Sequence, residues 1–367
     1  MGIKQLAKLI KEAAPEAVSS VPLQHYRDRI IALDAPIVIY QFYKGMPDII
    51  NRHGENIGHL QGLFYRTVTL LENGIKPVFV FEGRPPELKQ LMARRRAAAA
   101  AGTQKKDEDA VLGSSQNSKK VVKQDCETLL SFLGVPCIQA PSEGEATCAA
   151  LVASGQVWGT ATEDMDALPF GSTRLIRNLK ADKNCQVDEY DLPLILEKLQ
   201  LTHEQFVDLC ILLGCDYSEK IRGLGPKKAL KLLHEHGSIE QILQRIDLQK
   251  HPLPDFWHLQ ESRTLFLQPE VADANQVLLE WAEPNEEQLV HFLSHQKHMK
   301  EDRIRKRLGM MRERLQEAPK EKRQKRMGDY FPVKKSTARA KVSKPQKSSK
   351  ERKRPKMAVR SRDGMTK

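Results

Sequence analysis

Short apolar runs alternate with helical patterns along most of the chain. Apolar runs without polar alternation are typical of strands that are buried on both faces of a sheet. These runs lie at residues 29–33, 76–81, 135–139 and 157–161. Strands that alternate with helices indicate an α/β fold, so we expect a mostly parallel central sheet flanked by helices.

Helical patterns occupy the segments between and after these runs. Pro36 suits the first turn of a helix that follows the first strand. The apolar stripe in residues 60–71 predicts another helix, which ends at Gly74, and residues 146–154 predict a third. After Thr202 the chain is predicted to be mainly helical.

A polar insertion separates the second predicted strand from the third. It spans residues 84–133 and contains Lys89, Arg94, a run of alanines and a polar stretch at 102–118. This composition predicts a helical crossover, or arch, with a mobile tip. The charge pattern alone leaves two interpretations open, which are a basic surface that faces DNA and a solvated helical hairpin.

The net charge of +12 is distributed unevenly. Residues 320–367 contain 19 Lys or Arg and 4 Asp or Glu, so this tail carries +15 and the rest of the chain carries −3. A basic tail indicates nucleic-acid binding or a nuclear-import signal, and a tail that only aids solubility is the alternative. From about residue 319 the composition is rich in Lys, Arg and Ser, so we expect disorder.

Several classes of protein are disfavoured by the sequence. No apolar stretch approaches the length that spans a bilayer, and residues 1–6 suit an early helix rather than a signal peptide. Leu6 stands where a myristoylation motif requires Ser or Thr. The six cysteines form no C-x-x-C pair and have no His partners at zinc spacing, so reduced thiols are expected. We therefore expect a soluble, intracellular protein with no membrane partner.

Acidic residues follow each of the predicted strands. In chain order they are Asp34, Glu82, Glu143, Glu145, Asp164 and Asp166. Because the carboxyl ends of parallel strands meet at one edge of a sheet, these six carboxylates should converge there. They would repel one another without cations, and oxygen ligands without Cys or His suit Mg²⁺ or Mn²⁺. Two such ions about 4 Å apart can support phosphodiester hydrolysis.

Taken singly, these acids also have structural interpretations. Glu145 could complete a capping box with Ser142, and Asp34 could cap the helix that follows it. Asp164 and Asp166 could be placed by the dipole of a helix that begins there. Helix capping does not explain why all the apolar strands end in acids, so the pattern favours metal chemistry.

A glycine-rich segment at residues 222–228 is a second candidate site. Gly223 and Gly225 permit a tight turn with exposed backbone N–H groups, and Pro226 suits the start of the next helix. A helix N-terminus with Lys227 beside it attracts phosphate, so a hairpin that grips a DNA backbone is expected. An ordinary helical hairpin is the alternative.

Long motifs, all in the same order, relate the chain to a known family. They are Met1-Gly2-Ile3, Phe64-Tyr65-Arg66-Thr67, APSEGEA at 140–146, ATEDMD at 161–166, FVDLCILLG at 206–214 with Asp216-Tyr217, and IRGLGP at 221–226. Over most of residues 1–331 the chain resembles eukaryotic flap endonucleases, which are structure-specific 5′ nucleases of the XPG/RAD family. The resemblance implies 5′ flap cleavage, 5′-3′ exonuclease activity, and roles in Okazaki fragment maturation and base excision repair.

The same resemblance implies the ligands of two Mg²⁺ ions, for which Mn²⁺ could substitute. One ion would be held by Asp34, Glu82, Glu143 and Glu145 and the other by Asp164, Asp166 and Asp216. Lys89 and Arg94 resemble the catalytic basic pair at the base of the arch, which places the scissile phosphate. The other DNA-binding positions implied are Tyr40, which would stack on a nucleotide, and Arg66, Glu143, Gly214, Asp216, Gly223, Gly225 and Lys227. A K⁺ ion is implied at the glycine-rich hairpin.

The tail contains a short peptide of a recognisable type. Residues 324–331 resemble the motif by which replication proteins bind the trimeric sliding clamp, proliferating cell nuclear antigen, and the matching residues are Gln324, Met327, Tyr330 and Phe331. The three apolar side chains could form a plug that orders on binding, and a chance match is the alternative. Residues 350–356 resemble a nuclear-localisation signal, so the nucleus, including nucleolus and nucleoplasm, is the expected location, with the mitochondrion as a second.

The predicted layout places the nuclease in two regions. These are residues 1–100, with the arch at 84–133, and 134–318, with the hairpin at 221–237, followed by the tail at 319–367. We expect a monomer. Glu82 stands where the family usually has Asp, and its extra methylene could displace a metal ion. A catalytically weakened paralogue that binds branched DNA and the clamp as a scaffold is therefore the alternative function, and a related exonuclease or junction resolvase is disfavoured by the clamp peptide.

Overall fold

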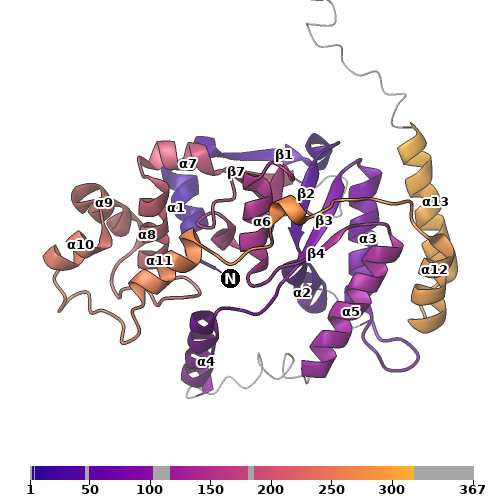
Figure 1. The fold of residues 1–367 in the computed structure, drawn as a ribbon, viewed down its shortest axis with the longest axis horizontal. Coiled ribbons are helices and arrows are strands. Elements are labelled where there is room, and N and C mark those ends of the chain that lie inside the picture. Colours follow the sequence, from indigo (N-terminus) through magenta and orange to yellow (C-terminus); the bar gives the residue numbers. More distant parts are fainter. Residues whose placement is uncertain (1, 4, 46–48, 102–115, 181–185, 318–367) are drawn as a thin grey trace, which may run out of the picture. The chain divides into compact units, whose positions relative to one another are not determined.

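A central sheet organises the part of the chain that the computed structural model describes, which is residues 2, 3, 5–45, 49–101, 116–180 and 186–317. Its strand order is β1-β7-β6-β5-β2-β3-β4 (Figure 1). The strands are β1 Val18–Pro22, β2 Ile30–Asp34, β3 Lys76–Phe81, β4 Cys137–Gln139, β5 Gly159–Ala161, β6 Arg174–Arg177 and β7 Gln186–Asp191. Strands β6, β5, β2, β3 and β4 are parallel, whereas β7 and β1 pair in antiparallel fashion. The mostly parallel α/β fold is confirmed.

The four predicted strands all form, and they lie together as β5-β2-β3-β4. Along β2, Ile31 and Leu33 enter one apolar core while Ala32 enters another, so both faces of the strand are buried. Strands β1, β6 and β7 were not predicted. The sequences of β1 (VSSVP) and β7 (QVDEYD) carry no continuous apolar run, and β6 (RLIR) has only two adjacent apolar residues, Leu175 and Ile176, which are both buried.

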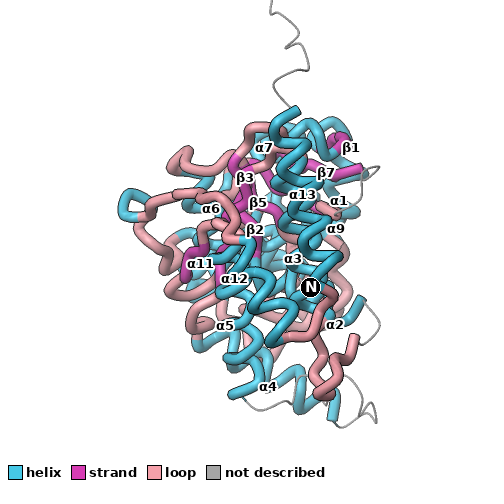
Figure 2. The backbone as a smooth tube through the Cα atoms, turned by 90° about the vertical axis from the view of Figure 1, so that its right-hand side faces the viewer, coloured by secondary structure: helices cyan, strands magenta, loops and turns pink. Residues whose placement is uncertain are grey.

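Helices cover both faces of the sheet, and Figure 2 shows the strands enclosed by helices and loops. The described helices are α1 Leu6–Ala13, α2 Ala35–Gly45, α3 Gly58–Glu72, α4 Glu87–Ala101, α5 Gln116–Phe132, α6 Gly144–Ala153, α7 Leu192–Leu199, α8 His203–Leu213, α9 Pro226–His236, α10 Ile239–Arg245, α11 Leu259–Leu267, α12 Glu286–Val290 and α13 Glu301–Glu317. One core joins the sheet to α3, α5, α12 and α13, and α6 packs on the opposite face. A third core joins α1 and α7 to α8–α11.

The helix boundaries follow local capping chemistry. Gly74, just beyond the end of α3, has φ of +73°, which a residue with a side chain adopts only at a cost. Helix α8 begins with a capping box in which Thr202 and Gln205 exchange hydrogen bonds, and α9 begins with Pro226 and is followed by Gly237 as its C-cap. The helices predicted from the sequence at these places are confirmed.

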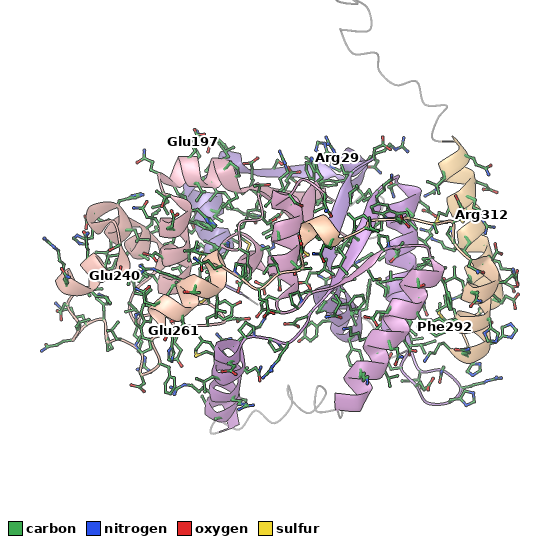
Figure 3. The ribbon with its side chains drawn as sticks, viewed as in Figure 1. Arg29, Glu197, Glu240, Glu261, Phe292 and Arg312 are labelled. Carbon is green, nitrogen blue, oxygen red and sulfur yellow. The ribbon has the colours of Figure 1, made fainter. Side chains whose placement is uncertain are left out.

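Two sets of ion pairs fasten the helices at opposite ends of the described chain. Glu72 of α3 is buried and lies 2.5 Å from Nη1 of Arg307 and 2.8 Å from Nη1 of Arg314, both on α13. On the other side, Arg263 of α11 pairs with Asp208 of α8 at 2.6 Å and with Glu240 of α10 at 2.5 Å. Figure 3 marks Glu240 on α10. These ion pairs join the outer helices to their neighbours, through a buried carboxylate at Glu72 and through a partly exposed one at Glu240.

The arch prediction is met by its two legs, α4 and α5. Of the polar stretch predicted at 102–118, residues 102–115 lie outside the described residues and 116–118 form the start of α5. The predicted tail and its clamp peptide, with Gln324, Met327, Tyr330 and Phe331, also lie outside them. Among the described helices, none combines the length and the apolar character needed to cross a membrane.

Candidate active site

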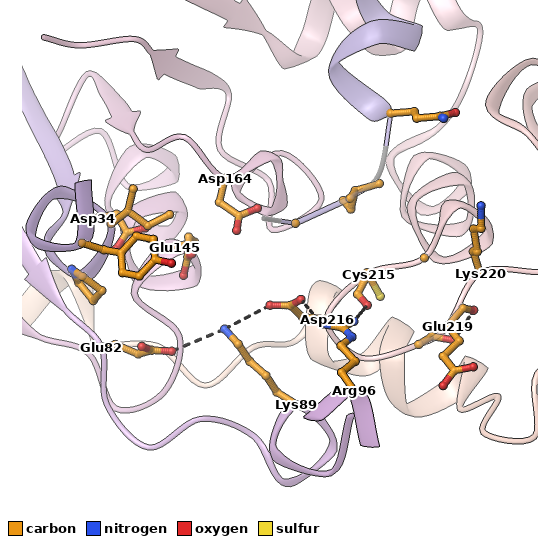
Figure 4. Close-up of a pocket in the computed structure, with 18 of the residues that line it drawn as sticks. Asp34, Glu82, Lys89, Arg96, Glu145, Asp164, Cys215, Asp216, Glu219 and Lys220 are labelled. Atoms are coloured by element: carbon orange, nitrogen blue, oxygen red, sulfur yellow. Dashed lines mark hydrogen bonds and ion pairs between the residues drawn. The ribbon is translucent and has the colours of Figure 1, made fainter. Parts of the chain in front are cut away.

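The predicted acids come together at one edge of the sheet. Asp34 ends β2 and Glu82 follows β3, whereas Glu143 and Glu145 begin α6 and Asp164 and Asp166 follow β5. A cavity of about 1010 Å³ lies here, and Figure 4 shows acidic side chains around it. The acids that line it are Asp34, Glu82, Glu145, Asp164, Asp216 and Glu219. Glu143 and Asp166 lie beside it, since they contact Lys89 and Asp164 respectively.

Burial and mutual repulsion raise the pKa of several of these acids. Burial raises the pKa of Asp34 to about 7, and the nearby charge of Asp164 adds to the shift although the Thr162 hydroxyl opposes it. Burial also raises the pKa of Glu145 and of Asp166 well above ordinary values, and neighbouring carboxylates add to both shifts. Such a cluster favours either protons or bound cations.

Lys89 is a cation of the chain that lies among these acids. Its Nζ lies 2.6 Å from Oε2 of Glu143. The same atom lies 3.5 Å from Oε1 of Glu82 and 3.7 Å from Oδ2 of Asp216 (Figure 4). Burial opposes its charge, but the carboxylates of Glu143, Glu145 and Glu82 outweigh burial and raise the pKa of Lys89. The predicted place of Lys89 beside the acids is therefore the place that it has in the structure.

Arg94, the second basic residue of the predicted pair, lies elsewhere. It lines a separate cavity with Gln260 and Glu261, whereas Arg96 reaches the acids. Arg96 donates from Nη1 to Oδ1 of Asp216 at 3.0 Å and from Nη2 to the carbonyl of Cys215 at 2.7 Å. Residues two apart on a helix face different ways, so Arg94 and Arg96 cannot both face the cavity. The assignment of Arg94 to this cluster is corrected to Arg96, which the seven-residue spacing from Lys89 on one helix face could have indicated.

A chain of hydrogen bonds orders the acids that follow β2 and β5. Thr162 donates its hydroxyl to Oδ2 of Asp34 at 3.0 Å and accepts the backbone N–H of Asp164 at 3.1 Å. Asp164 accepts the N–H of Asp166, whose Oδ1 in turn accepts the N–H of Ile3. Thr162 and the Ile3 backbone were missed in the sequence, because neither residue type signals chemistry.

The capping interpretations hold for some of the acids only. Asp164 does cap the short 3₁₀ helix Met165–Ala167 through Asp166. Glu143, rather than Ser142, occupies the N-cap position of α6, and its side chain makes no capping bond, so the proposed capping box is not formed. Capping therefore accounts for the local turn at Asp164, but it does not account for the acids at α6.

The donor chemistry of the cluster fits hard divalent cations. Every acidic ligand offers carboxylate oxygen, and Oε1 of buried Glu143 has no hydrogen-bond partner. Within the described ranges, no three Asp, Glu, His or Cys side chains stand close enough together to hold a metal ion as they are arranged. Lys89 lies among three of the predicted ligands, so these oxygens are paired with an ammonium group.

Gly214 and Asp216 form the side of the cavity opposite the sheet. Gly214 ends α8 with φ of +87°, and a Cβ there would come within 2.9 Å of the backbone N of Lys220. The close turn brings Asp216 between Lys89 and Arg96. Asp216 was predicted from the resemblance alone, and the structure brings it to the other acids.

Tyr40 and Arg66 have different surroundings. Tyr40 on α2 lines the same cavity as the acids, as a side chain that stacks on a nucleotide would. Arg66 on α3 is buried outside this cavity, where Nη1 donates to Oε1 of Gln41 at 2.7 Å and the guanidinium lies over the ring of Phe42. The structure does not bring Arg66 to the cluster.

The glycine-rich hairpin has the predicted turn. Gly223 has φ of +72°, and Gly225 is the N-cap of α9 with open space beside its Cα. His251 accepts from the ammonium of Lys228 at 2.6 Å and donates from Nδ1 to the carbonyl of Arg222 at 3.0 Å. Lys227 is 81% exposed and pairs with Glu12 at 2.9 Å. The turn, the helix N-terminus and an exposed lysine are thus in place for an anionic backbone.

Comparisons with known proteins agree with this geometry. Residues 1–103 match the XPG N-terminal domain and residues 134–216 match the XPG I-region. Flap endonuclease 1 of Ovis aries is 44% identical over 363 residues, which cover 94% of each chain. The catalytic core of Rad2 in complex with DNA substrate is 28% identical with a TM-score of 0.71, over 84% of this chain and 100% of that one. Flap endonuclease-1 from Methanococcus jannaschii is 26% identical with a TM-score of 0.63, over 82% and 97%.

The expected resemblance is confirmed by the identity and coverage of these relatives together. The chain belongs to the flap endonuclease family.

Proposed function

We propose that this protein is a structure-specific endonuclease that removes 5′ flaps from DNA by hydrolysing a phosphodiester bond, with 5′-3′ exonuclease activity on nicked DNA. The observation that carries the proposal is the cavity in which carboxylates face Lys89 and Arg96 across the carboxyl edge of the sheet. Membership of the flap endonuclease family supports it.

The seven acids are proposed to hold two Mg²⁺ ions, which Mn²⁺ could replace. Asp34, Glu82, Glu143 and Glu145 lie toward one ion and Asp164, Asp166 and Asp216 toward the other. Ions bound there would activate water and neutralise charge on the phosphate. The raised pKa values of Asp34, Glu145 and Asp166 support this, since bound cations would relieve the repulsion among these groups.

The other residues bind and orient the DNA. Lys89 and Arg96 present positive charge to the scissile phosphate once they leave their carboxylate partners. Tyr40 stacks on the nucleotide at the cavity. Gly223, Gly225 and Lys227 hold the downstream duplex backbone at the start of α9, and backbone carbonyls of the same turn hold a K⁺ ion.

The cellular setting is proposed from the tail and the family. Residues 324–331 bind the trimeric sliding clamp, and the monomeric enzyme acts in Okazaki fragment maturation and base excision repair. The basic tail directs it to the nucleus, and the mitochondrion is a second location. A peptide of residues 320–335 that fails to bind purified clamp in calorimetry would remove this part of the proposal.

Cleavage of a labelled 5′ flap tests the activity directly. Purified full-length protein with Mg²⁺ should cut near the junction, and Asp164→Ala should lose cutting while it retains flap binding in fluorescence anisotropy. Equal cutting by Asp164→Ala would sink the metal role. Flap, nick, gap and four-way substrates measured side by side separate a flap endonuclease from a related exonuclease or junction resolvase.

Glu82 keeps a second function open, which is a weakened paralogue that binds branched DNA and the clamp as a scaffold. Its Oε1 lies 3.5 Å from Nζ of Lys89, so the longer side chain already contacts the catalytic lysine. If Glu82 weakens catalysis, Glu82→Asp should raise the single-turnover rate by about tenfold or more. A rate that does not rise, together with efficient wild-type cutting, would rule out the scaffold function.

A further inference from the structure

Helix α4 carries the basic side of the cavity but has little apolar anchorage. Among its described side chains only Met92 is fully buried, and Leu88 packs partly against the core around α8. A helix with so small an apolar face gains little stability from packing. Polar contacts therefore decide where α4 lies, and with it Lys89 and Arg96.

Arg95 supplies such contacts on the same helix. Its guanidinium lies over the ring of Phe256, with Cζ 3.5 Å from the ring centroid, and its Nε lies 3.8 Å from Oε1 of Glu219. Phe256 belongs to the segment between α10 and α11, and Glu219 belongs to the loop after α8. A guanidinium that meets an aromatic face and a carboxylate is held from two directions.

The spacing along α4 links this contact to the cavity. Arg95 and Arg96 lie three and four positions after Met92, and Lys89 lies three positions before it. Residues at these spacings share one side of a helix, so Arg95 lies on the side that faces the body of the protein. Fixing Arg95 therefore fixes the rotation of α4 that points Lys89 and Arg96 at the acids.

We propose that Arg95 is a positioning residue, which clasps Phe256 and Glu219 and thereby holds α4 over the cavity before DNA binds. The inference rests on the proposed function, because it concerns how the same site is assembled. Its consequence is a preorganised basic face, so that catalysis does not wait for α4 to dock.

Arg95 differs from its neighbours in what it contacts. Lys89 and Arg96 pair with Glu143 and Asp216, which are proposed metal ligands, so both cations exchange partners when ions and phosphate enter. Arg95 contacts none of the seven acids through these bonds, and its contacts can persist during that exchange. The helix keeps its place while two of its side chains turn from carboxylate to phosphate.

A pair of substitutions at Phe256 tests the proposal. Phe256→Leu removes the aromatic face and keeps an apolar side chain, whereas Phe256→Tyr keeps the ring. In DNA-free full-length protein, amide hydrogen exchange in residues 87–99 should be about tenfold faster in Phe256→Leu and unchanged in Phe256→Tyr. Single-turnover cleavage of a 5′ flap should slow by about tenfold in Phe256→Leu alone, with an unchanged Kd for the flap.

Variants on α4 complete the test. Arg95→Gln should reproduce Phe256→Leu, and Ala93→Gln, on the exposed side of the helix, should match the wild type. Unchanged exchange in Phe256→Leu, or an equal effect of Phe256→Tyr, would overturn the proposal. Weaker flap binding with unchanged exchange would overturn it too and make Arg95 a DNA contact. If the wild type cuts no flap DNA, the proposed function fails, while hydrogen exchange still decides whether Arg95 holds α4.

Discussion

Two regions of the molecule bury carboxylates and neutralise them differently. Between α3 and α13, the Glu72 side chain is 1% exposed and pairs with two arginines, Arg307 and Arg314. At the sheet edge, Asp34 and Asp166 accept hydrogen bonds from Thr162 and from the Ile3 backbone, which are neutral donors. A buried carboxylate that is paired with arginines of the same chain indicates a structural role. A buried carboxylate whose hydrogen-bond donors are neutral indicates a site that binds cations from solution.

The largest effect that we expect at either region is the loss of cleavage activity in Asp34→Asn. The amide keeps an acceptor oxygen for Thr162 but removes a buried charge, so cleavage should fall by more than about a hundredfold while the melting temperature holds or rises. Single-turnover cleavage and calorimetry measure the two quantities. A lower melting temperature with intact cleavage would give Asp34 a structural role like that of Glu72 and would contradict a cation-binding role at the sheet edge.

Glu72→Gln should show the opposite pattern. Breaking the buried pairs leaves two arginines without their carboxylate, so the free energy of unfolding should fall by about 3 kcal/mol while cleavage by the folded protein stays unchanged. Urea unfolding measures the loss. Glu287→Gln is the matched control, because Glu287 pairs with Arg305 at the surface and its removal should change little.

Metal addition should stabilise the cavity region alone. At about a hundred times the Kd, Mg²⁺ or Mn²⁺ should stabilise the wild type by roughly 2.7 kcal/mol relative to protein in EDTA. The double variant Asp34→Asn with Asp164→Asn should show no such shift in calorimetry, and Glu72→Gln should keep it. A shift that survives in the double variant would place the ions elsewhere.

The two arginines of α4 offer a finer comparison. Arg96→Gln removes the contacts with Asp216 and the Cys215 carbonyl and should slow single-turnover cleavage by about tenfold to a hundredfold. Arg94→Gln should cost less, because Arg94 lines another cavity. If Arg94→Gln slowed cleavage more than Arg96→Gln, then Arg94 and not Arg96 would be the second basic residue that acts with Lys89.

The smallest expected effect concerns pH and the cluster at α11. The hydrogen bond from Arg263 lowers the pKa of Glu240 to about 2. A lowered folded-state pKa adds stability above the unfolded value of about 4.3, and this stability is lost as pH falls toward 2. Glu240 is 45% exposed, so the contribution should stay below about 1 kcal/mol. Melting temperatures from pH 5 to 2.5 should fall less steeply in Glu240→Gln than in the wild type.

The sequence was sufficient for the centre of the fold and for the place of most acids. Continuous apolar runs identified β2, β3, β4 and β5, and the sheet edge then brought Asp34, Glu82 and Asp164 together by geometry. Strands β1, β6 and β7 escaped prediction because none of them carries a long continuous apolar run. Polar residues interrupt the apolar ones in β1 and β7, and β6 has only Leu175 and Ile176.

Side-chain direction was harder to predict than position. The family resemblance was carried over to Arg94, whereas the positions of the side chains on α4 select Arg96. Arg66 stays a predicted DNA contact, and in this structure its guanidinium contacts Gln41 and Phe42. Asp216 comes from a loop after α8, so no strand pattern could have located it, and the family motif was required.

The order of strands in the sheet also bears on the distance between the two proposed ions. Strand β2 lies between β5 on one side and β3 with β4 on the other. The carboxyl edge of the sheet, where the acids lie, therefore has one half on each side of β2. Glu82, Glu143 and Glu145 come from the β3–β4 half, and Asp164 and Asp166 come from the β5 half. Neighbouring strands are about 4.8 Å apart, which is close to the separation of about 4 Å between paired catalytic ions. The distance between neighbouring strands would thus set the distance between the two proposed ions. Asp34, at the end of β2, lies between the two halves of the edge.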